Sequence, residues 1–124
     1  MGLKRIRESE EMYLETILLL RIKQANVRAV DVGEELGYAK SSVSRGLNLL
    51  KKKGYIEIDS VSGAITFTPK GKEKAESVYE KHKVLTAVLL KMGADKQLAE
   101  ENACRIEHVI SDELMELFKR YIEG

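Results

Sequence analysis

The sequence predicts a mainly α-helical α+β protein, with a helix-turn-helix and a β-hairpin in its first half and helices alone in its second. Apolar residues recur at helical spacing over most of the 124 residues. Two short amphipathic segments meet near Gly37, which is typical of a helix-turn-helix. Between residues 55 and 68 apolar and polar residues alternate instead, and this alternation indicates strands.

The composition indicates a soluble protein of one domain, or of one domain with a dependent helical extension. Apolar residues make up 44% of the chain and charged residues 33%, which suits a helix-rich globular protein. The single cysteine excludes an internal disulfide and favours a reducing cytoplasm. The N-terminus lacks the apolar core of a signal peptide, and no apolar run is long enough to span a bilayer. We therefore expect a cytoplasmic protein that does not enter a membrane.

Residues 9–24 are predicted to form the first helix, with Ser9 as its N-cap and two acidic residues in its first turn. The apolar residues of this segment follow one stripe, as expected of a helix that packs in a core. Met12 and Glu15 stand one turn apart on a neighbouring face. Such a pair is more commonly a packing residue beside a solvated one, so by itself it indicates no site.

The next two predicted helices cover residues 29–36 and about 40–53. The first ends at Gly37, because glycine is favoured in the residue that follows a helix. The second is expected to begin with Ser41 or Ser42 as its N-cap and to bury its apolar residues at helical spacing. Two helices joined by a short turn form a helix-turn-helix, in which the second helix reads DNA.

The second of these helices would carry the DNA contacts near its N-terminus. Between residues 36 and 56 the chain has five basic residues and no acidic one, although its net charge is only +1. A solvated helix end is the alternative, since residues 51–53 also complement the helix dipole. The charge and the motif together favour DNA. The predicted DNA-contacting residues are Lys40, Ser41, Ser42, Ser44 and Arg45.

A two-stranded hairpin is predicted directly after the helix-turn-helix. Ile56 and Ile58 alternate with acidic residues, and Ile65 and Phe67 alternate with threonines. Gly63 permits the positive φ that the connecting turn needs. This order of elements defines a winged helix. Because the wing carries little positive charge, we expect it to position the domain on DNA rather than to read the base sequence.

The second half is predicted to be all-helical, with helices over residues 70–91, 95–110 and 112–122, of which the second has Asp95 as its N-cap. From residue 73 onward there are eleven acidic and eight basic residues, so this half is not expected to bind DNA. Its amphipathic helices need a partner surface, most simply a second copy of the chain, because winged helices commonly act as dimers on paired half-sites. We therefore predict a DNA-binding domain over residues 1–71 and a dimerisation domain over residues 72–124.

The segment EENACRIEHVISD carries the residue types of a transition-metal site. On a helix Cys104, Glu107 and His108 would share one face, and Glu100 would stand one turn earlier. Thiolate, carboxylate and imidazole together form half of such a site. A buried structural cysteine beside a surface Glu–His pair is the alternative. His82, in the preceding helix, is the one other histidine.

The order of these motifs resembles the diphtheria-toxin-repressor family of iron- and manganese-dependent transcriptional regulators. The resemblance covers nearly the whole chain and rests on EEMYLETI, SSVSRGLNLLKKKGYI, TPKGK, the KH at residues 81–82 and the CRIEH at residues 104–108. It implies a homodimeric repressor that controls metal-uptake genes. A divalent metal ion is expected to promote the binding of this repressor to its operator. From this resemblance and from the residue types themselves, we predict the following metal-site residues: Met12, Glu15, His82, Glu100, Cys104, Glu107 and His108.

The ligand pattern combines two branches of that family. The iron-type primary site takes a Met from the first helix with the Cys, Glu and His of CxxEH, and all four are present here. The iron-type ancillary site is matched only by His82, since Thr86 and Glu100 stand at its other two positions. The manganese-type site is matched by Glu15, His82, Glu107 and His108, with Met12 and Cys104 in place of carboxylates.

These matches lead us to expect Fe(II) or Mn(II) as the effector. Sulfur ligands favour Fe(II), because Mn(II) prefers oxygen donors. The expected absence of the C-terminal SH3-like domain of the long iron-type members points to the manganese type instead. Two readings from other classes stay open, a metal-independent winged-helix regulator and a metalloenzyme. The second has no cleft-forming Gly-rich loop or separate general base to support it, so we expect no catalytic residues.

Overall fold

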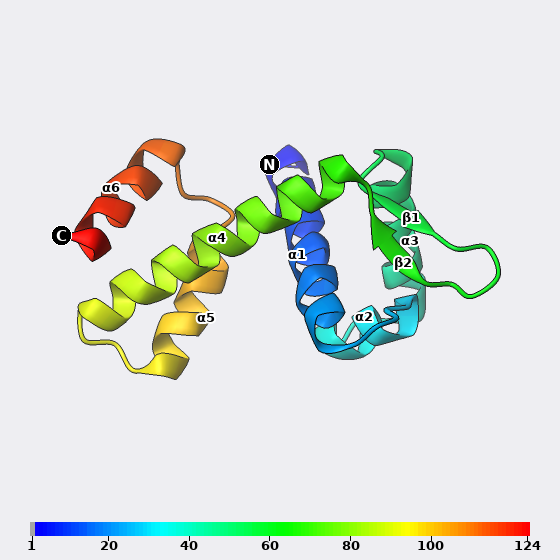
Figure 1. Cartoon of the computed structure of the whole chain (residues 1–124), viewed down its shortest axis with the longest axis horizontal. Coiled ribbons are helices and arrows are strands. Elements are labelled where there is room, and N and C mark those ends of the chain that lie inside the picture. The colour runs from blue at the N-terminus through cyan, green and yellow to red at the C-terminus, as the bar shows by residue number, and fades with distance from the viewer. Residues whose placement is uncertain (1) are drawn as a thin grey trace. The chain divides into compact units, whose positions relative to one another are not determined.

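The computed structural model describes the backbone of residues 2–124 and the side chains of residues 9–124. The mainly helical α+β fold that the sequence predicts is confirmed (Figure 1). The chain divides into two compact units between Glu76 and Ser77. In chain order the elements are α1 (Gly2–Lys23), α2 (Ala29–Leu36), α3 (Lys40–Lys52), β1 (Ile56–Ile58), β2 (Ile65–Phe67), α4 (Pro69–Lys91), α5 (Lys96–Ile106) and α6 (Asp112–Glu123).

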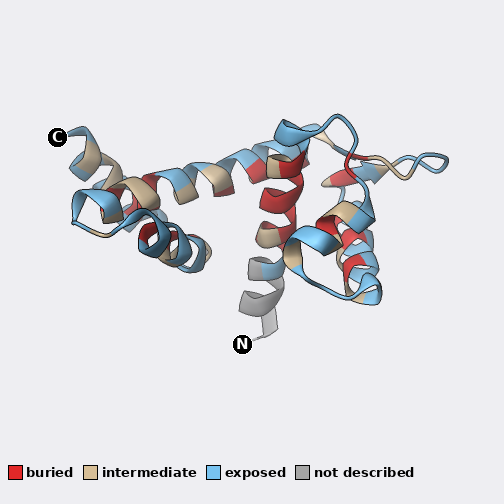
Figure 2. Cartoon of the chain, turned by 90° about the horizontal axis from the view of Figure 1, so that it is seen from below, coloured by how far each residue is buried: buried red, intermediate tan, exposed pale blue. Residues whose placement is uncertain are grey.

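The core of the first unit lies between α1, α2, α3 and the two strands. Buried residues gather along α1 and recur at helical spacing along α3, as the burial colouring of Figure 2 shows. Leu14, Ile17 and Leu50 are fully buried in it. The prediction that Ser9 caps the first helix is wrong, because α1 begins at Gly2. Residues 2–8 contain no proline and mostly good helix formers, so the helix continues through Ser9 in the N-terminal direction.

The two helices of the helix-turn-helix have the predicted extents. Gly37 ends α2 in the left-handed conformation at φ 70°, as its position predicts. The N-cap of α3 is Ala39 rather than Ser41 or Ser42, and no side chain caps this helix. The Ala39 carbonyl already accepts a hydrogen bond from the Val43 N–H at 3.1 Å, so the helix starts before the serines. Their hydroxyls are therefore not used in capping.

The hairpin is antiparallel, with Ile56 opposite Phe67 and Ile58 opposite Ile65. Gly63 has the predicted positive φ, 77°. The backbone N–H of Ser62 donates to the Asp59 carboxylate at 2.6 Å, and this hydrogen bond is the main cause that lowers the pKa of Asp59 below its usual value. The Ile65 N–H donates to the Val27 carbonyl at 2.7 Å. This last bond fixes the hairpin to the segment that connects α1 and α2.

The second unit consists of the C-terminal part of α4 with α5 and α6, around a core that includes Leu85, Ala103 and Met115. Asp95 caps α5 as predicted, and Ser111 caps α6 by accepting the Leu114 N–H at 3.2 Å. Among the residues that the structure describes, no helix combines the length and the apolar character that a membrane span requires.

The predicted helix over residues 95–110 is too long, because α5 ends at Ile106. The N–H groups of Val109 and Ile110 both donate to the Ile106 carbonyl at 3.0 Å, which closes a turn after the helix. Ser111 has extended backbone angles, as an N-cap requires, so the chain must leave the helical conformation before it reaches this residue.

Candidate metal centre and nucleic-acid interface

Glu107 is the centre of a polar cluster in the second unit. It follows the last residue of α5 with helical backbone angles, and its side chain is fully buried. Its Oε2 lies 2.7 Å from Nδ1 of His82, on α4, and its Oε1 lies 3.2 Å from Nε2 of His108. A buried carboxylate is costly unless it is paired. The His82 imidazole is the hydrogen-bonding partner of Oε2, whereas His108 only contacts Oε1.

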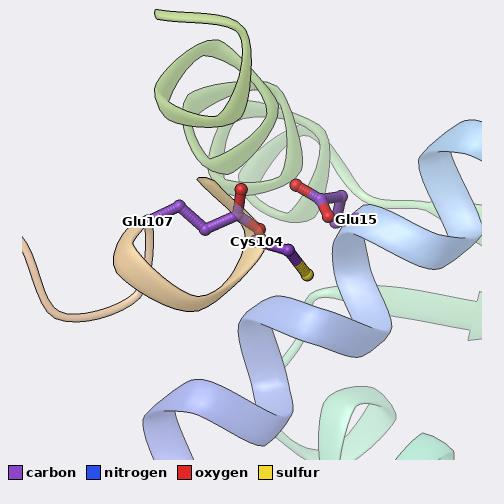
Figure 3. Close-up of side chains that lie close together, drawn as sticks. All are labelled: Glu15, Cys104 and Glu107. Atoms are coloured by element: carbon purple, nitrogen blue, oxygen red, sulfur yellow. The ribbon is translucent and has the colours of Figure 1, made fainter. Parts of the chain in front are cut away.

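Cys104 lies on α5, about one turn before Glu107 (Figure 3). Its side chain is exposed. Its Sγ lies within 4.8 Å of a carboxylate oxygen of Glu107. The prediction that Cys104, Glu107 and His108 share one helical face is wrong in one respect, because α5 ends at Ile106 and both Glu107 and His108 lie in the turn that follows it. The turn nevertheless leaves the His108 ring in contact with Glu107.

This cluster fits a divalent transition-metal ion. The Oε1 atom of Glu107 is buried and has no hydrogen bond, since its contact with His108 has the distance of an ion pair without the geometry of a hydrogen bond. A cation is the partner that such an oxygen lacks. Thiolate, carboxylate and imidazole are the donor types that borderline metals such as Fe(II) and Zn(II) take.

Thr86 and Glu100, which stand at the two unmatched positions of the iron-type ancillary site, have other surroundings than the residues around Glu107. The Thr86 hydroxyl donates to the His82 carbonyl at 2.8 Å, one turn earlier in α4, so it serves a bond within the helix. Glu100 is exposed on α5, one turn before Cys104. A role for Glu100 as a ligand stays a prediction.

Met12 and Glu15 belong to the first unit, where they stand one turn apart on α1. Met12 is half-buried, and its Sδ accepts a hydrogen bond from the Tyr38 hydroxyl at 3.5 Å. Glu15 is buried, with 8% of its surface exposed. The thioether and the carboxylate are thus both held on one helix of the module that contains the helix-turn-helix.

The N-terminal part of α3 presents polar side chains at the surface. Four of the five predicted DNA-contacting residues are exposed, and Ser42 is half-buried while its carbonyl accepts from the Tyr13 hydroxyl at 3.3 Å. Lys53, one of the five basic residues of this region, forms an ion pair with the buried Glu10 of α1. Lys53 thus has a structural partner, and Lys40, Arg45, Lys51 and Lys52 supply the positive charge of this surface.

Tyr38, in the turn between α2 and α3, is a residue that sequence reasoning missed. Its ring meets that of Tyr13 edge to face, with centroids 6.2 Å apart and planes at 74°. Burial is the main cause that raises the pKa of Tyr13, and Tyr38 adds to it. Met12 and Tyr38 are 26 positions apart, so no local spacing predicts their contact. An aromatic side chain in the turn of a helix-turn-helix is the only signal that the sequence offers.

Comparison with known proteins assigns both halves of the chain to one family. The N-terminal DNA binding domain of the iron dependent repressors matches residues 5–64, and their metal binding and dimerisation domain matches residues 68–124. An uncharacterized HTH-type transcriptional regulator of Methanocaldococcus jannaschii is 35% identical over 119 residues, 94% of each chain. The regulator MntR of Lysinibacillus sphaericus is 31% identical over 103 residues, 83% of this chain and 73% of the relative.

Solved structures agree in fold. A manganese-dependent transcriptional repressor in complex with manganese superposes with a TM-score of 0.84 at 24% identity, over 92% of this chain and 52% of that one. The IdeR protein of T. acidophilum does so with a TM-score of 0.81 at 23% identity, over 92% and 54%. The chain spans about half the length of these two proteins. The resemblance that the sequence motifs indicate is confirmed, and the chain belongs to the diphtheria-toxin-repressor family of metal-dependent, DNA-binding transcriptional regulators.

Proposed function

We propose that this protein is a homodimeric transcriptional repressor whose operator affinity is raised by a divalent transition-metal ion, Fe(II) or Mn(II), and that it controls metal-uptake genes. The observation that carries the proposal is the buried Glu107 carboxylate, gathered with Cys104, His82 and His108 in one unit. The other unit of the same chain presents the exposed polar start of α3.

The proposed ligands come from both units. His82, Cys104, Glu107 and His108 belong to the second unit, and Met12 and Glu15 to the first, while Glu100 is the ligand with the least support. A bound divalent metal would supply the positive charge that these donors are suited to hold. It binds best to conformations in which both units offer their ligands, so it shifts the population toward those conformations. The recognition helices of the dimer then fit paired half-sites on the operator.

Exposed apolar side chains on the second unit support the homodimer. Single exposed apolar residues are normal on the surface of a monomer, whereas several large ones on one small unit provide apolar surface that a partner can cover. The second unit has several such residues, each with 42–69% of its surface exposed. We propose a second copy of the chain as the partner that covers them. They are Leu90, Met92, Leu98, Val109, Leu114, Leu117 and Tyr121.

Metal addition is expected to tighten operator binding by roughly 5- to 150-fold, the range that coupling of about 1–3 kcal/mol produces. Fluorescence anisotropy of an operator selected from random DNA would measure this with Fe(II), Mn(II) and Zn(II) at matched free concentrations under anaerobic conditions. Because of the sulfur donors, Fe(II) is expected to act at the lower concentration than Mn(II). Operator binding that a chelator leaves unchanged would instead identify a metal-independent winged-helix regulator.

Replacing Arg45 by Ala is expected to relax base preference at one operator position by about 1–3 kcal/mol, because an exposed arginine in the first turns of a recognition helix is placed to read a guanine edge. Binding to a set of single-base operator variants measures the effect. Arg105→Ala, on the exposed surface of α5, is the matched control and should leave the preference unchanged. Equal weakening on every variant would make Arg45 a phosphate contact.

A further inference from the structure

We propose that the Tyr38 hydroxyl competes with the metal ion for the thioether of Met12, and that this contact makes the turn before the recognition helix respond to metal ligation. The inference rests on the proposed function, in which Met12 is a ligand. Both residues lie in the first unit, so the contact is independent of how the second unit is placed.

The contact itself is a hydrogen bond from the Tyr38 hydroxyl to Sδ of Met12, at 3.5 Å. A thioether sulfur is a weak acceptor. A metal ion bound to that sulfur withdraws electron density from it, so the sulfur accepts a hydrogen bond less well. Ligation therefore weakens the bond to Tyr38. Because the coupling between two partners of one group is reciprocal, the bond to Tyr38 must weaken ligation by the same factor.

Tyr38 is connected to the start of the recognition helix by two routes. Along the chain it precedes Lys40, the first residue of α3, by two positions. In space its ring packs edge to face on Tyr13, whose hydroxyl donates to the Ser42 carbonyl of α3. Met12 and Tyr13 are adjacent on α1. Met12, the residue that would bind metal, thus contacts the turn before α3 through Tyr38. Its neighbour Tyr13 contacts the first turn of α3 through Ser42.

The turn also has room to change its conformation. A cavity of about 390 Å³ lies beside it, lined by Tyr38 with residues of α2 and α3 that include Val30, Gly33 and Val43. Tyr38 is 42% exposed, so its ring is not locked in the core. When Met12 no longer accepts its hydrogen bond, the partly exposed ring has this cavity beside it.

Anaerobic titration of the full chain with Co(II), followed by absorbance, tests the competition. Tyr38→Phe is expected to tighten Co(II) binding about two- to fivefold, as expected for the loss of one partly exposed hydrogen bond. In a Met12→Leu background the same change is expected to have no effect, because no sulfur is left to compete for. Tyr13→Phe is the matched control, since its hydroxyl binds the Ser42 carbonyl and not Met12.

A second measurement observes the contact without metal. With ¹³C-methyl-labelled methionine, the resonance that Met12→Leu removes is assigned to Met12, one of four methionines. In the metal-free protein Tyr38→Phe is expected to shift this resonance, and Tyr13→Phe is expected to shift it less. Equal shifts in the two variants would mean that the ring pair, rather than the hydroxyl of Tyr38, is what Met12 senses, and would overturn the proposal.

Three titration results overturn the inference: unchanged or weaker Co(II) binding in Tyr38→Phe, an equal gain in the Met12→Leu background, or an equal gain in Tyr13→Phe. Co(II) binding that Met12→Leu leaves unchanged also overturns it, because Met12 is then no ligand. That last result leaves the proposed function standing on the ligands of the second unit. Absence of Co(II) binding by the wild-type chain is the outcome that rejects the proposed function itself.

Discussion

Replacing Glu107 by Gln is expected to weaken metal binding by about 100-fold or more. This exceeds the effect usual for a residue that only hydrogen-bonds to a metal ligand. The Glu107 carboxylate lies between the imidazoles of His82 and His108, 2.7 and 3.2 Å from their nearest nitrogens. Glutamine has nearly the same shape but carries no charge, and its amide nitrogen cannot bind a cation. The variant thus removes the one buried negative charge of the cluster while it retains the packing.

The same variant is expected to change the stability of the metal-free protein by no more than about 1 kcal/mol, because the loss of the two contacts is offset by the smaller cost of burying a neutral amide. Urea unfolding with and without Co(II), at one protein concentration, separates the two effects. At 100 times its dissociation constant the ion should stabilise the wild type by about 2.7 kcal/mol and the variant by far less.

Glu101→Gln, a change at an exposed position of α5, is the matched control and should retain the full stabilisation by metal. The opposite pattern would contradict the assignment: a Glu107→Gln protein that is several kcal/mol less stable without metal, yet is stabilised by metal as the wild type is. Glu107 would then be a structural partner of the histidines and not a ligand.

The sequence predicts the elements well where a single residue determines an end. Gly37 ends α2 through its left-handed conformation, and Asp95 begins α5 through a side-chain hydrogen bond, both where the sequence predicts them. The start of α3 could not be predicted in this way, because a backbone carbonyl, that of Ala39, begins the helix. The end of α5 was missed because the apolar spacing continues through Ile110 although the helix does not.

The sequence could single out the ligand-type residues of the second unit because the chain holds one cysteine and two histidines, so their spacing is informative. Their role as metal ligands stays a prediction. Contacts between distant segments were not predictable. Lys53 was counted as part of the DNA-binding surface, and its ion pair with Glu10 joins residues 43 positions apart. The bond of Tyr38 to Met12 is hidden for the same reason. Periodicity describes one element at a time, and these contacts depend on how α1 packs against the helix-turn-helix.

Replacing Gly71 by Ala is expected to destabilise the protein by about 2–4 kcal/mol, although alanine is the better helix former by about 1 kcal/mol. Gly71 lies in the first turn of α4, and a Cβ at this position would lie 1.8 Å from the Tyr55 carbonyl oxygen. That oxygen accepts the Thr68 N–H at 3.0 Å and the Thr68 hydroxyl at 3.1 Å, so it cannot move without breaking both bonds. The clash therefore outweighs the gain in helix propensity.

Gly33→Ala provides the matched control, because this glycine is also helical but a Cβ there meets only Val43 Cγ2 at 3.4 Å and the Tyr38 carbonyl at 3.6 Å. With ordinary contacts and no positive φ, this change should stabilise the protein by roughly 0.5–1 kcal/mol. Urea unfolding of the metal-free chain measures both variants, and opposite signs are expected. If both were stabilised, helix propensity would dominate at both positions. The close approach of α4 to the Tyr55 backbone would then not be what requires glycine at position 71.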